Sequence, residues 1–311
     1  MTKYIVSGYI GFDNFGDEAI ARVLVENLRA KDAEEIILIS SNPEKTAKLY
    51  NVKSCGMLKF LPYLKQSDVL ISGGGSLLQD VTSLKSLIYY LGVIYSALIL
   101  RKKVVIFAQG IGPIKSKIGT LLTKFALKKA EKISVRDKKS QELLESWNIA
   151  SELVHDPILD LSLENRGKKG TVGIQLRKFA GLNDEFLEAL AQEIAERFGD
   201  KKIEILSLQD SIDSEVCHKF CDFLKKSGIE NSTVYENLSS DEVIEHIQNL
   251  EYLIAMRFHA NVVGIKSGVK TLAINYDPKV AKLAEEFNIP IVELNQTDLS
   301  DAFNKLLNIN F

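Results

Sequence analysis

The sequence contains little cysteine, and its cysteines are not arranged in pairs. Its 311 residues include three, Cys55, Cys217 and Cys221, with no spacing that indicates a disulfide framework. Such a chain is expected in a reducing compartment, so we predict a cytoplasmic protein. Cys217 and Cys221 are four residues apart in a helix-like stretch, but no second pair accompanies them, so a zinc site has little support.

Several familiar catalytic and targeting signatures are also missing. The chain has no Ser-His-Asp order, no zinc signature and no Walker motif, and the glycines from Gly8 to Gly16 do not match GxGxxG, which disfavours a dinucleotide site. The start, MTKYIV, leads directly into a predicted strand, so no signal peptide is expected. The uncharged run 86–100, SLIYYLGVIYSALIL, is shorter than the about 20 residues that span a bilayer. It is expected to form a buried or interfacial helix.

The net charge is only −2, but positive charge is concentrated in one segment. Residues 101–132 contain nine Lys or Arg against the single acid Glu131. This segment is either a solvated helix face or a surface for anionic lipid head groups at the inner membrane face or for a pyrophosphate-linked acceptor. Nucleic acid is not expected as a partner, because the segment lacks a series of aromatic residues interleaved with the charges and suited to base stacking. The oligomeric state stays open, a homo-oligomer included.

Strand-like and helix-like runs alternate along the whole chain, which predicts parallel sheets in α/β layers. In the first half the predicted strands are 4–7, 35–39, 69–71, 104–107, 132–135 and 152–154; in the second they are 171–176, 203–207, 233–235, 252–255, 271–275 and 291–293. The polar segment 159–170 between these halves is the predicted linker. We therefore predict two doubly wound, Rossmann-like domains, 1–160 and 170–311, with ligands in a cleft between them. The last helix could pack back on the first domain.

An acidic loop, GYIGFDNFGDEAI at 8–20, follows the first predicted strand and precedes a helix. A glycine loop in this position usually binds phosphate through backbone N–H groups. Here the carboxylates of Asp13, Asp17 and Glu18 would repel phosphate, whereas they suit sugar hydroxyls or the removal of a proton. Asn14 and Gly16 belong to the same loop. Asp17 could instead cap the following helix.

Two further glycine turns and an Arg–Asp pair follow strands in the first half. The sequence ISGGGS includes Gly74 and Gly75, and FAQGIGP includes Gln109 and Gly110; such turns let backbone amides approach a ligand closely. Arg136 and Asp137 follow the strand 132–135, where they could bind a ligand or form an ordinary salt bridge with each other.

Polar and cationic residues follow the strands of the second half as well. Arg257 and His259 stand in LIAMRFHA, at the junction of a strand and a helix, where an arginine fork and a titrating imidazole suit an anion. Other residues at predicted strand ends are Gln175, Arg177, Gln209, Asp210, Asp213, Asp277 and Lys279. The first half thus supplies carboxylates and the second supplies cations.

Six ordered motifs, GYIGFDNFGDEAI, LISGGGSLLQD, FAQGIGPI, SVRD, MRFHA and NYDPKV, resemble the polysaccharide pyruvyl transferase family over residues 4 to about 295. The match is best to its bacterial cell-wall branch, CsaB. The resemblance implies a GT-B-like fold and a transferase that moves pyruvate from phosphoenolpyruvate (PEP) onto a sugar as a ketal. In that branch the acceptor is a lipid-linked disaccharide containing N-acetylmannosamine. The 4,6-pyruvylated product is a secondary cell-wall polymer that anchors S-layer proteins.

The resemblance also implies roles for individual residues. Arg257, Arg136 and Lys279 are expected to bind PEP, and His259 to stabilise the leaving phosphate or transfer a proton. Asp13 or Asp17 would be the base, and we expect Arg257→Ala to abolish PEP binding with little change in the melting temperature of the unliganded protein. No cofactor or metal is expected.

Two other functions compete with this one. The first is a GT-B glycosyltransferase that uses a nucleotide sugar, although no convincing platform for a base is evident in the second half. The second is a non-enzymatic carbohydrate-binding protein of the cell envelope, which the density of Arg, His and Asp at strand ends disfavours.

Overall fold

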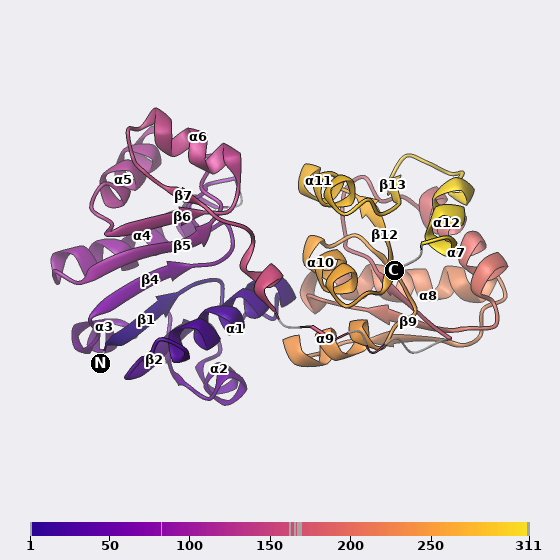
Figure 1. Ribbon diagram of the computed structural model, residues 1–311, viewed down its shortest axis with the longest axis horizontal. Helices are drawn as coiled ribbons and strands as arrows, with labels where there is room; N and C mark the ends of the chain where they lie inside the picture. Colours follow the sequence, from indigo (N-terminus) through magenta and orange to yellow (C-terminus); the bar gives the residue numbers. More distant parts are fainter. Residues whose placement is uncertain (1, 82, 162, 165, 167–169, 310–311) are drawn as a thin grey trace. The chain divides into compact units, whose positions relative to one another are not determined.

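The computed structural model describes residues 2–81, 83–161, 163–164, 166 and 170–309. The chain forms two compact units, 1–161 and 162–311, each with its own parallel sheet (Figure 1). The boundary between the units falls inside the polar segment 159–170. Each unit is described separately below.

The N-terminal unit contains a seven-stranded parallel sheet in the order β3-β2-β1-β4-β5-β6-β7. The strand order reverses between β1 and β4, which is the point where sheets of this kind usually bind ligands, at the carboxyl ends of the strands. The strands are β1 (Lys3–Ser7), β2 (Glu35–Ser40), β3 (Lys53–Gly56), β4 (Val69–Gly73), β5 (Lys103–Gln109), β6 (Lys132–Val135) and β7 (Glu152–Leu153).

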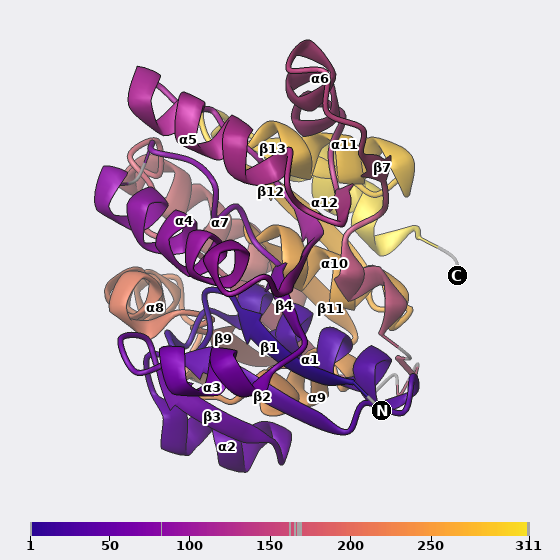
Figure 2. The same ribbon diagram turned by 90° about the vertical axis from the view of Figure 1, so that its left-hand side faces the viewer.

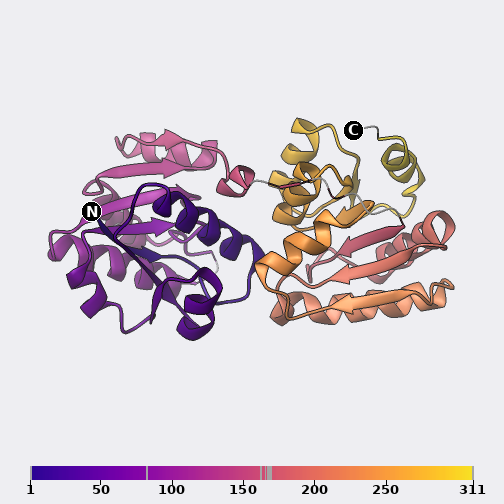
Figure 3. The ribbon, with the colours of Figure 1, turned by 60° about the horizontal axis from the view of Figure 1, so that its bottom comes forward.

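Helices cover both faces of this sheet because alternate strand residues point to opposite sides. Helices lie on both sides of the sheet (Figure 3). Ile5 and Leu70 belong to the core beneath one helical layer, while their neighbours Val6 and Ile71 belong to the other. The first layer holds α3 (Leu61–Gln66), α4 (Leu84–Ile99), α5 (Lys117–Leu127) and α6 (Lys138–Ser146), and the second holds α1 (Phe15–Arg29) and α2 (Pro43–Tyr50). The short 3₁₀ helix η1 (Pro157–Asp160) contacts α1.

The C-terminal unit repeats this plan with six parallel strands in the order β10-β9-β8-β11-β12-β13. Its switch point lies between β8 and β11, where the strand order reverses. The strands are β8 (Thr171–Gln175), β9 (Lys202–Leu206), β10 (Ser232–Tyr235), β11 (Tyr252–Ala255), β12 (Lys270–Asn275) and β13 (Ile291–Glu293).

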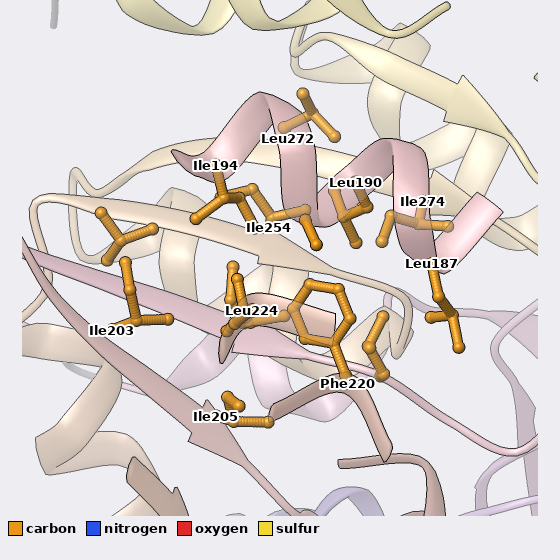
Figure 4. Close-up of a cluster of buried hydrophobic side chains, with 14 of the residues drawn as sticks. Leu187, Leu190, Ile194, Ile203, Ile205, Phe220, Leu224, Ile254, Leu272 and Ile274 are labelled. Carbon is orange, nitrogen blue, oxygen red and sulfur yellow. The ribbon is translucent and has the colours of Figure 1, made fainter. Parts of the chain in front are cut away.

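The main core of this unit lies between its sheet and the helices α7 (Asp184–Phe198), α8 (Asp210–Lys226) and α12 (Ser300–Leu307). Figure 4 shows Leu190 and Ile194 of α7 and Phe220 of α8 against strand residues such as Ile205 and Ile254. The other face carries α10 (Phe258–Lys266) and α11 (Pro278–Glu286), and α9 (Ser240–Gln248) packs against α10.

The predicted class, two doubly wound parallel-sheet domains, is confirmed, and every predicted strand is present. Strand β3 was missed because KSCG has no apolar run and lies at the edge of the sheet. The run 86–100 forms most of α4, which buries one face in the core. Helix α12 packs on β12 within the C-terminal unit, and its predicted packing on the first domain stays a prediction, as does the cleft.

Candidate functional site

Most of the predicted site residues follow the carboxyl ends of the strands, and in a parallel sheet these ends share one edge. In the N-terminal unit the glycine turn after β4 is tied to the one after β5, since Gly110 N–H donates to the carbonyl of Gly75 at 3.0 Å. The side chain of Arg136, after β6, reaches the same turn through Ser76 Oγ at 3.3 Å. Three predicted segments therefore meet at this edge.

The loop between β1 and α1 holds its carboxylates in different environments. Asp13 has a positive φ of 55°, and its carboxylate pairs with Lys45 Nζ of α2 at 2.7 Å. Asp17 accepts a hydrogen bond from the side-chain amide of Asn14. Asn14, not Asp17, is the N-cap of α1, so the alternative of Asp17 as the capping residue is wrong. Gly16 lies buried in the first turn of the helix.

Glu18 has a role that the sequence did not indicate. Its side chain is 7% exposed; it accepts the backbone N–H of Gly11 at 2.7 Å and the hydroxyl of Tyr50 at 2.5 Å. Burial raises the pKa of this carboxyl above its ordinary value of 4.5, and the charges of Asp17 and Asp13 add to the rise, while the two hydrogen bonds oppose it. Glu18 therefore holds the loop in place from a buried position. The sequence did not indicate this role, because Tyr50 is far from Glu18 along the chain.

The glycine turn after β4 lies directly against Asp17. Gly74 and Gly75 have φ values of 74° and 62°, a region that favours glycine. A Cβ on Gly75 would stand 2.5 Å from Asp17 Oδ1, and a Cβ on Gly74 would stand 2.7 Å from Ile20. Because neither turn residue has a side chain, the carboxylate of Asp17 can approach the ends of β1 and β4, at the switch point.

Gln109 and Arg136 are both held by side chains of the same unit. Gln109 is fully buried and donates from Nε2 to Ser72 Oγ at 2.8 Å. Arg136 forms an ion pair with the buried Asp156 at 2.8 Å, which joins the end of β6 to η1. Asp137 caps α6 instead of pairing with its neighbour, so the alternative of an Arg136–Asp137 salt bridge is wrong.

In the C-terminal unit Arg257 is 8% exposed and forms a two-pronged ion pair with Asp213 of α8. Its Nε and Nη2 lie 2.7 and 2.8 Å from the two carboxylate oxygens, and Nη2 also donates to Gln209 at 3.1 Å. Its backbone N–H donates to Gln175 at the end of β8. Arg257 thus joins the ends of β8 and β11 to α8, and the PEP contact expected for it stays a prediction.

His259 and Lys279 come from different helices, and both lie near the ring of Phe258. The ring of His259 meets that of Phe258 edge to face at 5.2 Å, and Lys279 Nζ lies 5.7 Å from the centre of the Phe258 ring. Lys279 is exposed at the start of α11, where Asp277 is the N-cap. The first turn of α10, which contains His259, has no acidic residue. The positive end of this helix and two basic side chains therefore occupy one region.

Arg177, after β8, lies beside the end of β12. Its guanidinium carbon is 5.5 Å from the centre of the Tyr276 ring, and Nη1 donates to the Tyr276 hydroxyl at 3.5 Å. Its Nε is buried without a hydrogen-bond partner among the residues that the structure describes. A buried donor of this kind usually has a partner, so it can serve a ligand that enters here.

Within the described ranges, no group of three or more His, Cys, Asp or Glu residues is arranged to hold a metal ion. The three cysteines are buried as free thiols. Burial raises the pKa of Cys55 to about 11. Among the predicted cationic residues, the C-terminal unit contains Arg177, Arg257 and Lys279, and the N-terminal unit contains Arg136.

Solved structures with the same architecture include glycosyltransferases and a sugar-nucleotide epimerase. HepE from Anabaena, solved with UDP and glucose, matches with a TM-score of 0.65 and 10% identity over 99% of this chain and 90% of that one. A glycosyltransferase from Rickettsia africae matches with a TM-score of 0.64 and 12% identity, over 98% of this chain and 88% of that one. A putative UDP-N-acetylglucosamine 2-epimerase from Listeria monocytogenes matches with a TM-score of 0.59 and 12% identity, over 99% of this chain and 88% of that one. At such low identity these likenesses define the fold class, two Rossmann-like domains of the GT-B type.

Sequence comparison gives the family. The model of the polysaccharide pyruvyl transferases matches residues 14–278, which is most of the chain. The chain therefore belongs to the polysaccharide pyruvyl transferase family, and it is a transferase of polysaccharide biosynthesis. A search of curated proteins finds no match.

Proposed function

We propose that this protein transfers the pyruvyl group of PEP onto two hydroxyls of a sugar, forming a cyclic ketal. Membership of the polysaccharide pyruvyl transferase family is the observation that carries the proposal. The resemblance of its motifs to the cell-wall branch favours a lipid-linked N-acetylmannosamine disaccharide as acceptor and a 4,6-ketal as product. The reaction then belongs to secondary cell-wall polymer synthesis, before S-layer anchoring, in the cytoplasm at the inner membrane face.

The strand ends of the C-terminal unit suit the donor. PEP carries a carboxylate and a phosphate, so it needs at least two cationic contacts. Arg177 offers a buried Nε with no hydrogen-bond partner in the described part of the chain. Lys279 offers an exposed ammonium group beside the acid-free first turn of α10. Arg257 is the positioning residue here, because its guanidinium holds Asp213 and its backbone N–H holds Gln175.

The proposed chemistry requires one acid and one base. The acid protonates the methylene carbon of PEP, which leaves an oxocarbenium centre at C2. One sugar hydroxyl attacks this centre, and the base accepts its proton. Phosphate then departs, and the second hydroxyl closes the ketal, its proton leaving with the phosphate. Acid and base each typically contribute about 10²–10⁴-fold. We assign His259 to the leaving phosphate and its proton.

Asp17 is the stronger candidate for the base. Its carboxylate lies against Gly75 at the switch point of the N-terminal sheet. Asp13 is the weaker candidate, because its carboxylate already forms an ion pair with Lys45. Asp17 can approach the turn after β4 because Gly75 has no side chain, and a Cβ there would stand 2.5 Å from Asp17 Oδ1.

A nucleotide-sugar glycosyltransferase is the alternative that the fold permits, since HepE binds UDP and glucose. The fold is shared by both kinds of enzyme, so it favours neither. The two functions separate by donor: thermal-shift titration with PEP and, in parallel, with UDP-glucose and UDP-N-acetylglucosamine identifies the ligand.

The decisive experiment measures phosphate release from PEP and, by mass spectrometry, a pyruvate ketal on a lipid-linked disaccharide analogue. We expect Lys279→Ala to weaken PEP binding at least about tenfold, the cost of one charged contact. His259→Ala and Asp17→Asn should still bind PEP and lose at least about 10²-fold in turnover. Lys282→Ala, an exposed lysine one turn further along α11, is the matched control. Stabilisation by UDP-sugars and not by PEP, with no ketal formed, would refute the proposal.

A further inference from the structure

Helix α5 exposes an apolar stripe that its own unit does not cover. Ile118, Leu121, Leu122 and Phe125 have exposed fractions of 72, 68, 37 and 55%. Their spacing places them on one side of the helix. Another side of the helix, which includes Ala126 and Leu127, is buried in the core of the N-terminal unit. A helix that is apolar on both sides usually has a second apolar environment to meet.

Helix α4 continues this surface. Ile88 and Ile99, 56 and 79% exposed, lie eleven residues apart and so share one side of α4 with Tyr95. The ring of Tyr95 stacks on that of Phe125, with centroids 6.3 Å apart, and its hydroxyl donates to the carbonyl of Leu122 at 2.8 Å. The two helices lie side by side (Figure 2). We call Ile88, Ile99, Ile118, Leu121, Leu122 and Phe125 the α4–α5 surface.

Positive charge accompanies these apolar residues, and negative charge is absent from the segment. The sequence has no Asp or Glu between Asp80 and Glu131. Within that span, lysines lie on α4, α5 and their flanks at 85, 115, 117, 124, 128 and 129. By contrast, Lys103 and Lys132 of the same basic segment pair with Glu131 and Glu152.

The combination of apolar and basic side chains indicates which kind of partner fits the α4–α5 surface. An exposed apolar patch marks a site for a protein or a membrane. A second copy of this chain would bring the same lysines face to face, because a two-fold interface pairs each patch with itself. An anionic bilayer instead offers acyl chains to the stripe and phosphates to the lysines. Among the described residues no helix is long and apolar enough to cross a bilayer, so the contact is with its surface.

We propose that the α4–α5 surface docks on the anionic face of a lipid bilayer, with the apolar stripe of α5 inserted at the boundary between head groups and acyl chains. Only part of the basic segment 101–132 therefore binds lipid. The lysines around α5 are the ones that contact lipid head groups. The proposal depends on the N-terminal unit alone and stands apart from the identity of the donor and acceptor.

Vesicle flotation tests this proposal with the full-length protein. Wild-type protein should float with vesicles of phosphatidylcholine containing phosphatidylglycerol and much less with phosphatidylcholine alone, and added salt should weaken the binding. Leu121→Ser combined with Phe125→Ser should lower the bound fraction at least about tenfold, because two large apolar side chains lose their burial. Lys117→Gln with Lys128→Gln and Lys129→Gln should abolish the preference for the anionic lipid.

Controls separate lipid binding from folding, charge and catalysis. Phe287→Ser, an exposed aromatic of the C-terminal unit, and Lys31→Gln with Lys48→Gln, on the α1–α2 side of the sheet, should bind as wild type does. Melting temperature and turnover of a soluble acceptor should be unchanged in the α5 variants. Equal flotation of the Leu121/Phe125 variant and wild type would overturn the proposal. So would dissociation of a wild-type oligomer by that variant, since the surface would then be a subunit interface.

Discussion

At the scale of single residues, the acidic loop holds Asp13, Asp17 and Glu18 in three different environments. The residue types around Asp13, Asp17 and Glu18 indicated hydroxyl binding or proton removal. Their environments differ because Lys45 and Tyr50 of α2, about thirty residues further along the chain, contact Asp13 and Glu18 respectively. Contacts over such separations depend on the packing of α2 beside α1, which local patterns do not encode.

Glu18 gives a prediction on stability against pH. Its pKa is raised in the folded protein, so the native state keeps a proton that the unfolded chain loses above about 4.5. The stabilisation is full below that value and is lost as the pH rises through the native pKa. Glu18→Gln keeps an acceptor for Gly11 N–H but does not titrate, so its stability relative to wild type should increase with pH across this window. Urea unfolding at a series of pH values measures the difference.

The control for this experiment lies on the same helix. Asn27 of α1 is exposed and has no titrating group, so Asn27→Gln should follow the wild-type pH profile. A constant difference between Glu18→Gln and wild type at all pH values would contradict the assigned pKa shift.

At the scale of helices and strands, the sequence located the strand ends but not the side chains that reach them from helices. The pattern LIAMRFHA identified Arg257 and His259 correctly as residues after β11. It did not reveal that Asp213, on the inner side of α8, holds the guanidinium. A single buried charge on a helix is not evident from the sequence, because it takes one core-facing position in the same 3.6-residue repeat as the apolar residues around it.

The Arg257–Asp213 pair corrects the expectation that Arg257→Ala leaves the unliganded protein as stable as before. Asp213 is fully buried, so removing its partner leaves a charge unpaired, at a cost of about 3–5 kcal/mol. Replacing both residues together, Arg257→Met with Asp213→Leu, should recover most of this loss, because no isolated charge remains. Urea unfolding of the two single variants and the double variant measures the coupling. Equal destabilisation by the single and double variants would show that the pair does not act as a unit.

At the scale of the whole chain, the alternation of strands and helices predicted both sheets because fully buried parallel strands are short, β-branched runs. The polar segment 159–170 contains the boundary for a related reason, since a segment without apolar periodicity joins neither core. Each unit has its own core clusters, built from residues of that unit alone.

The core clusters that each unit contains predict two independent folding units. Residues 1–161 and 162–311, expressed separately, should each unfold cooperatively on heating, with the far-ultraviolet circular dichroism of an α/β protein. If PEP binds to Arg177 and Lys279 as proposed, it should raise the melting temperature of the C-terminal fragment and not that of the N-terminal one, because a ligand stabilises only the unit that it binds. Calorimetry of the fragments and of the intact chain, each with and without PEP, measures this. A non-cooperative melt of either fragment would mean that its core needs the other half of the chain.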